Sequence, residues 1–224
     1  MRADRSRVVQ RALVNVATGF VIVALAAGAG LLGWTMGRPH TKHTPPPPPP
    51  PPATALLAAV RSMQAAASYQ FSGRVTIGVE VLNVSGRFST PDRVDETLQL
   101  VGGPPIERVG VGTVTYQRGP FGWRRVAAPG ANGDPRAVFT ALASASGVTR
   151  NGSAYTFSVS GAAASGLVPG AGPGTVVTGS ASVASGWVQS LTYRSSAGAG
   201  TAVELTCSAF GTAPQVTTPV TVPG

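Results

Sequence analysis

The side chains that could perform acid–base, nucleophilic or metal chemistry are few in this chain of 224 residues. Its two histidines, His40 and His43, lie beside a run of prolines, and Cys207 is its only cysteine. A Ser/His/Asp arrangement needs a histidine base, and structural zinc sites are built from cysteine and histidine. Because no histidine follows residue 43, we expect a protein that is not an enzyme, with no catalytic residue, no metal site and no disulfide within the chain.

One group of carboxylates remains as a candidate metal site, formed by Asp92, Asp95 and Glu96. The group directly follows Pro91, a residue typical of turns, so we expect a solvated turn and strand edge here. The stretch GAGPG at 170–174 resembles a phosphate-binding loop, but Pro173 has no backbone N–H and no strand-loop-helix context follows. We therefore expect no cofactor.

Four arginines of the C-terminal part could bind an anion. Arg108, Arg118, Arg124 and Arg125 lie close together in the sequence, and the arginine fork suits phosphate geometrically. They would hold an anionic head group if they met at the rim of a sheet. We favour an exposed, solubilising face, because nothing in the sequence fixes these side chains on one edge. Residues 53–224 carry only +4 of the net charge of +9, and their charges are scattered singly along the chain, so no nucleic-acid partner is expected.

Cys207 alternates with Val203, Leu205 and Ala209, which predicts a place on the apolar face of a strand. Buried cysteines of this kind are common and act as small apolar residues. The alternative is a disulfide between two copies of the chain. Either way, Cys207 is not expected to be catalytic.

The first 36 residues have the pattern of a membrane anchor. The chain is uncharged from Val14 to Met36, about the length needed to cross the hydrocarbon core as a helix. Arginines precede this run, and positive charge on a short flank predicts that the flank stays in the cytoplasm. We expect a cytoplasmic tail over 1–12, a single transmembrane anchor over 13–36, and an extracytoplasmic C-terminal domain. Cleavage of a signal peptide at Ala27-Gly28-Ala29 is the alternative.

Eight consecutive prolines at 45–52 separate this anchor from the rest of the chain. Proline fixes φ and lacks a backbone N–H, so the run should form an extended polyproline II rod about 25 Å long. We therefore expect a Pro-rich linker over 37–53 and one folded domain over 54–224.

The pattern of the folded domain predicts an α+β architecture. Apolar residues at helical spacing predict a helix over 53–67, and Asp134-Pro135 predicts the start of a second helix. Strict alternation from Tyr69 predicts a first strand that ends in a turn near 81–83, and 162–174 reads as a long flexible loop. We expect two main helices on the concave side of a strongly curved antiparallel sheet, an incomplete β-barrel. The further strands are expected at 94–101, 106–112, 113–118, 122–127, 154–160, 176–183, 187–196 and 201–209.

Several phrases resemble the superfamily of bacterial envelope proteins that includes LolA and the LppX/LprG branch. They are YQFSG at 69–73, GRFSTPDR at 86–93, TYQRG at 115–119 and SAFGTAPQVTTP at 208–219. The resemblance spans about residues 56–219 and implies a curved half-barrel that binds lipid in an actinobacterial envelope. Members of the LppX/LprG branch usually carry a lipobox cysteine, whereas here an apolar segment and a proline run would provide the anchor.

A half-barrel that its own side chains do not fill offers an apolar concavity for a ligand. The expected partners are the membrane, a lipid or other lipophilic ligand, and an envelope protein if the chain resembles the RseB-like sensor branch instead. The inward-facing residues could also be plain core, which is the commoner role for alternating apolar positions. The candidate wall residues are Phe71, Val75, Ile77, Val84, Phe88, Leu98, Leu100, Tyr116, Phe157, Leu191 and Tyr193.

Overall fold

The computed structural model describes residues 48–126, 137–168, 171–172, 174–195 and 200–221. Within these ranges no helix is both long enough and apolar enough to cross a membrane. The predicted anchor over 13–36 lies outside the described residues. Asp134 and Pro135, the predicted start of the second helix, also lie outside them.

The first described helix, α2, spans Pro52–Ala65 and confirms the helix predicted over 53–67. The last proline of the run is therefore also the first residue of a helix, a position where a missing N–H costs nothing. The preceding Pro51 has φ −52° and ψ 145°, close to polyproline II values. The buried side chains of α2 follow helical spacing and are Leu56, Ala59, Val60 and Met63.

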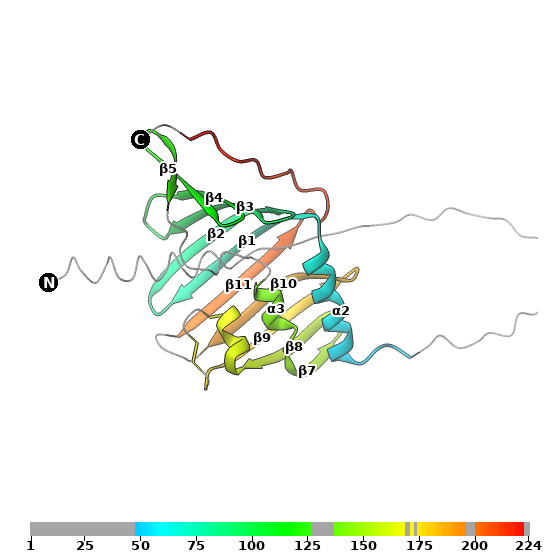
Figure 1. Cartoon of the computed structure of the whole chain (residues 1–224). Coiled ribbons are helices and arrows are strands. Elements are labelled where there is room, and N and C mark those ends of the chain that lie inside the picture. Colours follow the sequence, from blue (N-terminus) through cyan, green and yellow to red (C-terminus); the bar gives the residue numbers. More distant parts are fainter. Residues whose placement is uncertain (1–47, 127–136, 169–170, 173, 196–199, 222–224) are drawn as a thin grey trace, which may run out of the picture.

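In the part of the chain that the structure describes, an antiparallel sheet of eleven strands forms the body of the domain (Figure 1). The strand order is β6-β5-β4-β3-β2-β1-β11-β10-β9-β8-β7, so β6 and β7 are the two edges of a curved, unclosed sheet. Its strands are β1 Ser68–Ile77, β2 Glu80–Ser89, β3 Arg93–Leu100, β4 Ile106–Val111, β5 Val114–Gly119, β6 Gly122–Val126, β7 Ser146–Asn151, β8 Ala154–Ser160, β9 Val176–Ala184, β10 Trp187–Ser195 and β11 Thr201–Ser208.

Some predicted boundaries were wrong. The first hairpin turns at Gly78 and Val79, not near 81–83, because Gly78 adopts φ 59° and allows a two-residue turn. Strand β7 was missed. The predicted loop over 162–174 contains the 3-10 helix η1, Gly161–Gly166, which the buried Leu167 and Val168 follow.

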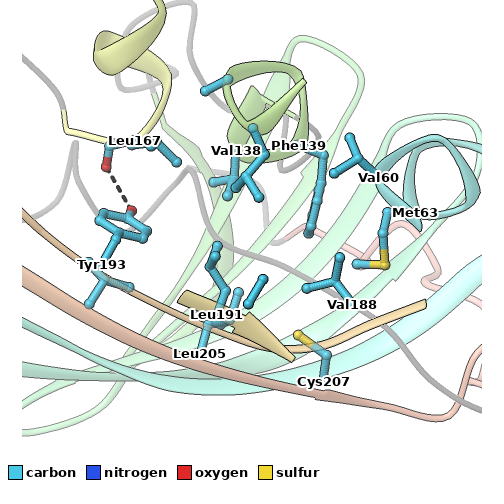
Figure 2. Close-up of a cluster of buried hydrophobic side chains, with 14 of the residues drawn as sticks. Val60, Met63, Val138, Phe139, Leu167, Val188, Leu191, Tyr193, Leu205 and Cys207 are labelled. Atoms are coloured by element: carbon cyan, nitrogen blue, oxygen red, sulfur yellow. Dashed lines mark hydrogen bonds between the residues drawn. The ribbon is translucent and has the colours of Figure 1, made fainter. Parts of the chain in front are cut away.

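The helices lie on one face of the sheet, which we call the inner face; it carries Phe71, Val75 and the residues in phase with them. The six-residue α3 (Ala137–Leu142) contacts both α2 and η1. The main contacts with the sheet are those of α2 with β7 and β10 and those of η1 with β8 and β9. Figure 2 shows Val60 and Met63 of α2 and Phe139 of α3 above this part of the inner face. The main core therefore lies between the helices and the β7–β11 half of the sheet.

The C-terminal segment after β11 lies on the opposite, outer face. Gly211 N donates to the carbonyl oxygen of Ser68, and Val216 N donates to Ser89 Oγ at 3.0 Å. Arg93 Nη1 donates to the carbonyl oxygen of Val216, and Thr221 forms a bridge with Trp123. These contacts carry the segment across the outer face of the β1–β6 half.

Tyr193 joins the sheet to the loop after η1, because its Oη donates a 2.7 Å hydrogen bond to the carbonyl oxygen of Leu167 (Figure 2). We expect Tyr193→Phe to lower the free energy of unfolding by about 1–2 kcal/mol, since a buried carbonyl loses its donor. Chemical denaturation measures this. The matched variant Tyr116→Phe, at a half-buried tyrosine, should change stability by less than about 0.5 kcal/mol. Equal losses of stability in the two variants would contradict a stabilising role for the hydrogen bond between Tyr193 and Leu167.

Candidate functional site

The inner face is the candidate site, and strand register brings ten of the eleven predicted wall residues onto it. Eight of them are buried within one hydrophobic cluster, while Ile77 and Leu100 are half-buried at its margin. Tyr116 lies on the outer face instead, since it pairs with Val109, which pairs with Asp95 on that face. The eight buried residues are Phe71, Val75, Val84, Phe88, Leu98, Phe157, Leu191 and Tyr193.

Two inner-face glycines let aromatic rings lie directly on the sheet. Phe71 pairs with Gly86, and a Cβ on Gly86 would lie 2.5 Å from Phe71 Cζ. In the other half, Phe157 pairs with Gly179, where a Cβ would lie 2.8 Å from Phe157 Cζ. Each ring fills the place of the missing side chain, so the wall stays closely packed where the sheet curves.

The inner face remains apolar beyond the strands that the helices mainly contact. Tyr69 and Phe88 stack with ring centroids 4.4 Å apart, and Leu82, Val84 and Leu98 continue the buried wall across β2 and β3. On β4 the inner face is less closely packed, because a Cβ on Gly110 would meet no atom within 4 Å. The β1–β4 half of the inner face is thus an apolar wall that meets a more open region at β4.

A buried acid and a buried base interrupt this wall. Glu96 of β3 and Arg108 of β4 are direct partners in the register, and their exposed fractions are 4% and 5%. Arg108 Nη2 lies 3.4 Å from Gln117 Oε1, while its Nε and Nη1 are buried without a hydrogen-bond partner. A guanidinium stays protonated in proteins. The pair therefore places a positive charge with unused donors inside an apolar wall.

Burial controls the ionisation of both groups. Loss of water raises the pKa of Glu96 to about 8, against the opposing effect of Arg108 and with a smaller contribution from Asp95 in the same direction. Burial also lowers the pKa of Arg108, and the charge of Glu96 opposes this. Desolvation thus dominates their mutual attraction. Glu96 is largely protonated at neutral pH, while Arg108 remains a cation.

The structure corrects our expectation for both charged groups. Glu96 does not belong to a solvated turn with Asp92 and Asp95, since its side chain points to the inner face. Asp95 lies on the outer face and forms a 2.7 Å ion pair with Arg87. Within the described ranges, no three acidic, histidine or cysteine side chains come together as metal ligands.

The four arginines that could have formed one anion site are divided between the two faces. Arg108 and Arg124 lie on the inner face, where Gln117 pairs with both, but only Arg108 is buried. Arg118 lies on the outer face in a 2.8 Å ion pair with Glu107, and Arg125 pairs with Tyr116 there. The expected exposed position is thus found for Arg118, Arg124 and Arg125, whereas it is wrong for the buried Arg108.

Cys207 lies on the inner face, as its alternation predicted. It is buried next to Phe71 in the register and close to Met63 and Val188 in Figure 2. The alternative of a disulfide between copies would need this side chain to leave the core.

No protein-family model matches the chain, and no curated protein matches it in sequence. Solved structures do match. The lipoprotein LppX of Mycobacterium tuberculosis is 16% identical, with 73% of this chain and 99% of that chain covered at a TM-score of 0.50. LprF of Mycobacterium bovis is 12% identical, with 77% and 95% covered at a TM-score of 0.49. The chain has the LppX/LprG-like fold that its sequence phrases indicated.

Proposed function

We propose that this chain is a membrane-tethered extracytoplasmic protein that binds a lipid or another lipophilic ligand and takes part in envelope lipid handling. The tether would be the uncleaved apolar segment over 13–36, with the N-terminus in the cytoplasm and the linker over 37–53 between them. The role is one of binding rather than catalysis. A binding role fits a folded domain that contains no histidine, since both histidines of the chain precede α2.

The observation that carries this proposal is the apolar inner face of the β1–β4 half, which extends beyond the strands that the helices mainly contact. An apolar wall with few polar groups is typical of small-molecule sites. Here the polar group is the buried Glu96–Arg108 pair. The resemblance to the LppX/LprG branch supports a lipid as the ligand.

Photo-crosslinking of the full chain in vesicles tests the proposal. A lipid with a photoreactive acyl chain is added, and the labelled peptides are identified by mass spectrometry. We expect labels on inner-face residues of β2 and β3, such as Val84 and Leu98, because acyl chains would lie against them. Outer-face residues of the same strands, such as Ser85 and Thr97, serve as the internal control. Labelling confined to 13–36 would contradict a lipid site in the domain.

The second candidate is an RseB-like sensor or interaction module. It is favoured by the burial of eight predicted wall residues, since a wall packed by its own side chains needs no ligand. Crosslinking of the full chain in native membranes would then capture a defined envelope protein. The photoreactive lipid would leave the inner face unlabelled in that case, which separates the two candidates.

A further inference from the structure

Exposed apolar side chains occupy the tips of three neighbouring hairpins. Val79 lies between β1 and β2, Val101 between β3 and β4, and Phe121 between β5 and β6. Their exposed fractions are 97%, 68% and 91%, and they are among the most exposed large apolar side chains of the described residues. We call these three residues the hairpin tips. Single exposed apolar side chains are common on protein surfaces. These three are notable because they lie at successive alternate turns of one sheet.

The hairpin tips all lie at one end of the sheet. Consecutive strands run in opposite directions, so the turns after β1, β3 and β5 share an end. The hydrogen bond from Val101 N to the carbonyl oxygen of Val81 places the second tip beside the first hairpin. This end is on the left in Figure 1, opposite α2.

Two further exposed valines belong to the same end. Val176 begins β9, whose next residue pairs with Ser195 at the end of β10, and Ser195 pairs with Thr201 at the start of β11. Val220 adjoins the bridge between Thr221 and Trp123, near the start of β6. Both are at least half exposed. The exposed apolar residues thus follow one rim across both halves of the sheet.

An apolar path leads from the hairpin tips to the candidate site. Ile77, Leu100 and Ile106 lie on the inner face next to the first two tips and are half-buried. Leu98, two residues further from the rim than Leu100 on β3, pairs with Ile106 and is fully buried. Apolar surface is therefore continuous from the exposed rim to the buried wall.

We propose that the hairpin tips insert into the surface of a lipid membrane. Each tip is a single exposed side chain with a glycine on one side, and neighbouring tips are separated by two strand spacings, about 10 Å. A protein partner generally packs against a contiguous apolar core. Isolated side chains suit a fluid interface, where each enters independently.

Charge beside the third tip favours the same partner. Arg124 of β6 lies three residues after Phe121 and is exposed, whereas the charge of the nearby Arg118 is paired with Glu107. Exposed arginine next to an apolar side chain favours anionic lipid over neutral lipid. The inference does not depend on lipid binding by the inner face.

Site-specific fluorescence in the full chain tests the inserted tips. All variants are made in a Cys207→Ala background, so that a single new cysteine carries the NBD label. The label is placed at Val79→Cys, Phe121→Cys or Thr113→Cys. Thr113 is the control, because it is exposed on the β4–β5 turn at the opposite end of the sheet. The chain is reconstituted in phosphatidylcholine–phosphatidylglycerol vesicles that all contain acyl-chain nitroxide. Contact with its own or a neighbouring membrane then quenches the label. We expect quenching by about half or more at 79 and 121, and little at 113.

A second measurement tests the apolar contribution directly. With the label at Val101→Cys, the pair Val79→Ser and Phe121→Ser should lower the docked fraction about tenfold, since two apolar anchors are lost. Thr113→Ser is the matched control and should change nothing. Equally low quenching at 79, 121 and 113 would overturn the proposal. Quenched tips with an unlabelled inner face would support docking while contradicting the proposed lipid site.

Discussion

Replacing Gly86 with alanine is expected to lower the free energy of unfolding by about 3 kcal/mol or more. A Cβ at this position would overlap the carbonyl oxygen of Asp95 and lie 2.5 Å from Phe71 Cζ and 2.9 Å from Glu96 Cα. The oxygen belongs to the backbone of β3, so it cannot move without disturbing the β2–β3 pairing. The Phe71 ring is buried in the core, so any movement would disturb the side chains packed around it. Both neighbours therefore resist the new methyl group.

Chemical denaturation of Gly86→Ala and Gly110→Ala gives the matched comparison. Gly110 is also an inner-face strand glycine, but a Cβ there meets no atom within 4 Å. Gly110→Ala should be neutral or stabilise by about 0.4–1 kcal/mol, because alanine restricts the unfolded chain. Gly179→Ala should behave like Gly86→Ala. Similar effects at positions 86 and 110 would show that the rings do not need the glycines beneath them.

Stability should fall as pH rises from about 5 to 8 because of Glu96. Burial raises its pKa from the ordinary 4.5 to about 8, so the folded chain holds a proton that the unfolded chain releases. The stabilisation from this proton is complete below pH 4.5 and is lost as pH rises through about 8. The slope reaches about 1.4 kcal/mol per pH unit between these values. Denaturation midpoints measured across this range would reveal it.

Glu96→Gln should remove most of this slope and make the chain more stable than the wild type above pH 8, since glutamine carries no charge to desolvate. Glu107→Gln is the matched control, because Glu107 lies partly exposed in an ion pair on the outer face. That variant should retain the slope. If Glu96→Gln were instead less stable at every pH, Glu96 would be ionised and paired with Arg108 in the folded chain.

Alternation predicted the strands well where one face is apolar and the other polar. β8 was predicted at its observed bounds, and β1 was found from the regular phase that begins at Tyr69. The first turn was misplaced because Val79 and Val81 continue the alternation through it, although Val79 is almost fully exposed. Edge strand β7 was missed because it buries almost no apolar side chain, so its sequence carries no alternating signal.

The polar centre of the candidate site was missed for a different reason. Charged residues were assigned to the surface by type, yet Glu96 lies in phase with Val94 and Leu98 on β3. Likewise, Arg108 lies in phase with Ile106 on β4. Phase alone would have placed both inside. For Tyr116 the error was the reverse. The aromatic residue was predicted to face inward, but in β5 the polar Thr115 and Gln117 face inward and Tyr116 faces outward.

The strand order also governs how the chain assembles. Every neighbouring pair in the sheet joins consecutive strands except β1 and β11, which come from opposite ends of the domain. The first six strands can form a local meander early, while β1 keeps an unpaired edge until β11 has been synthesised. Closing that long loop should set the folding rate. The last strand thus protects the first from pairing with another copy, and a chain that ends before residue 201 would leave a β edge open to self-association.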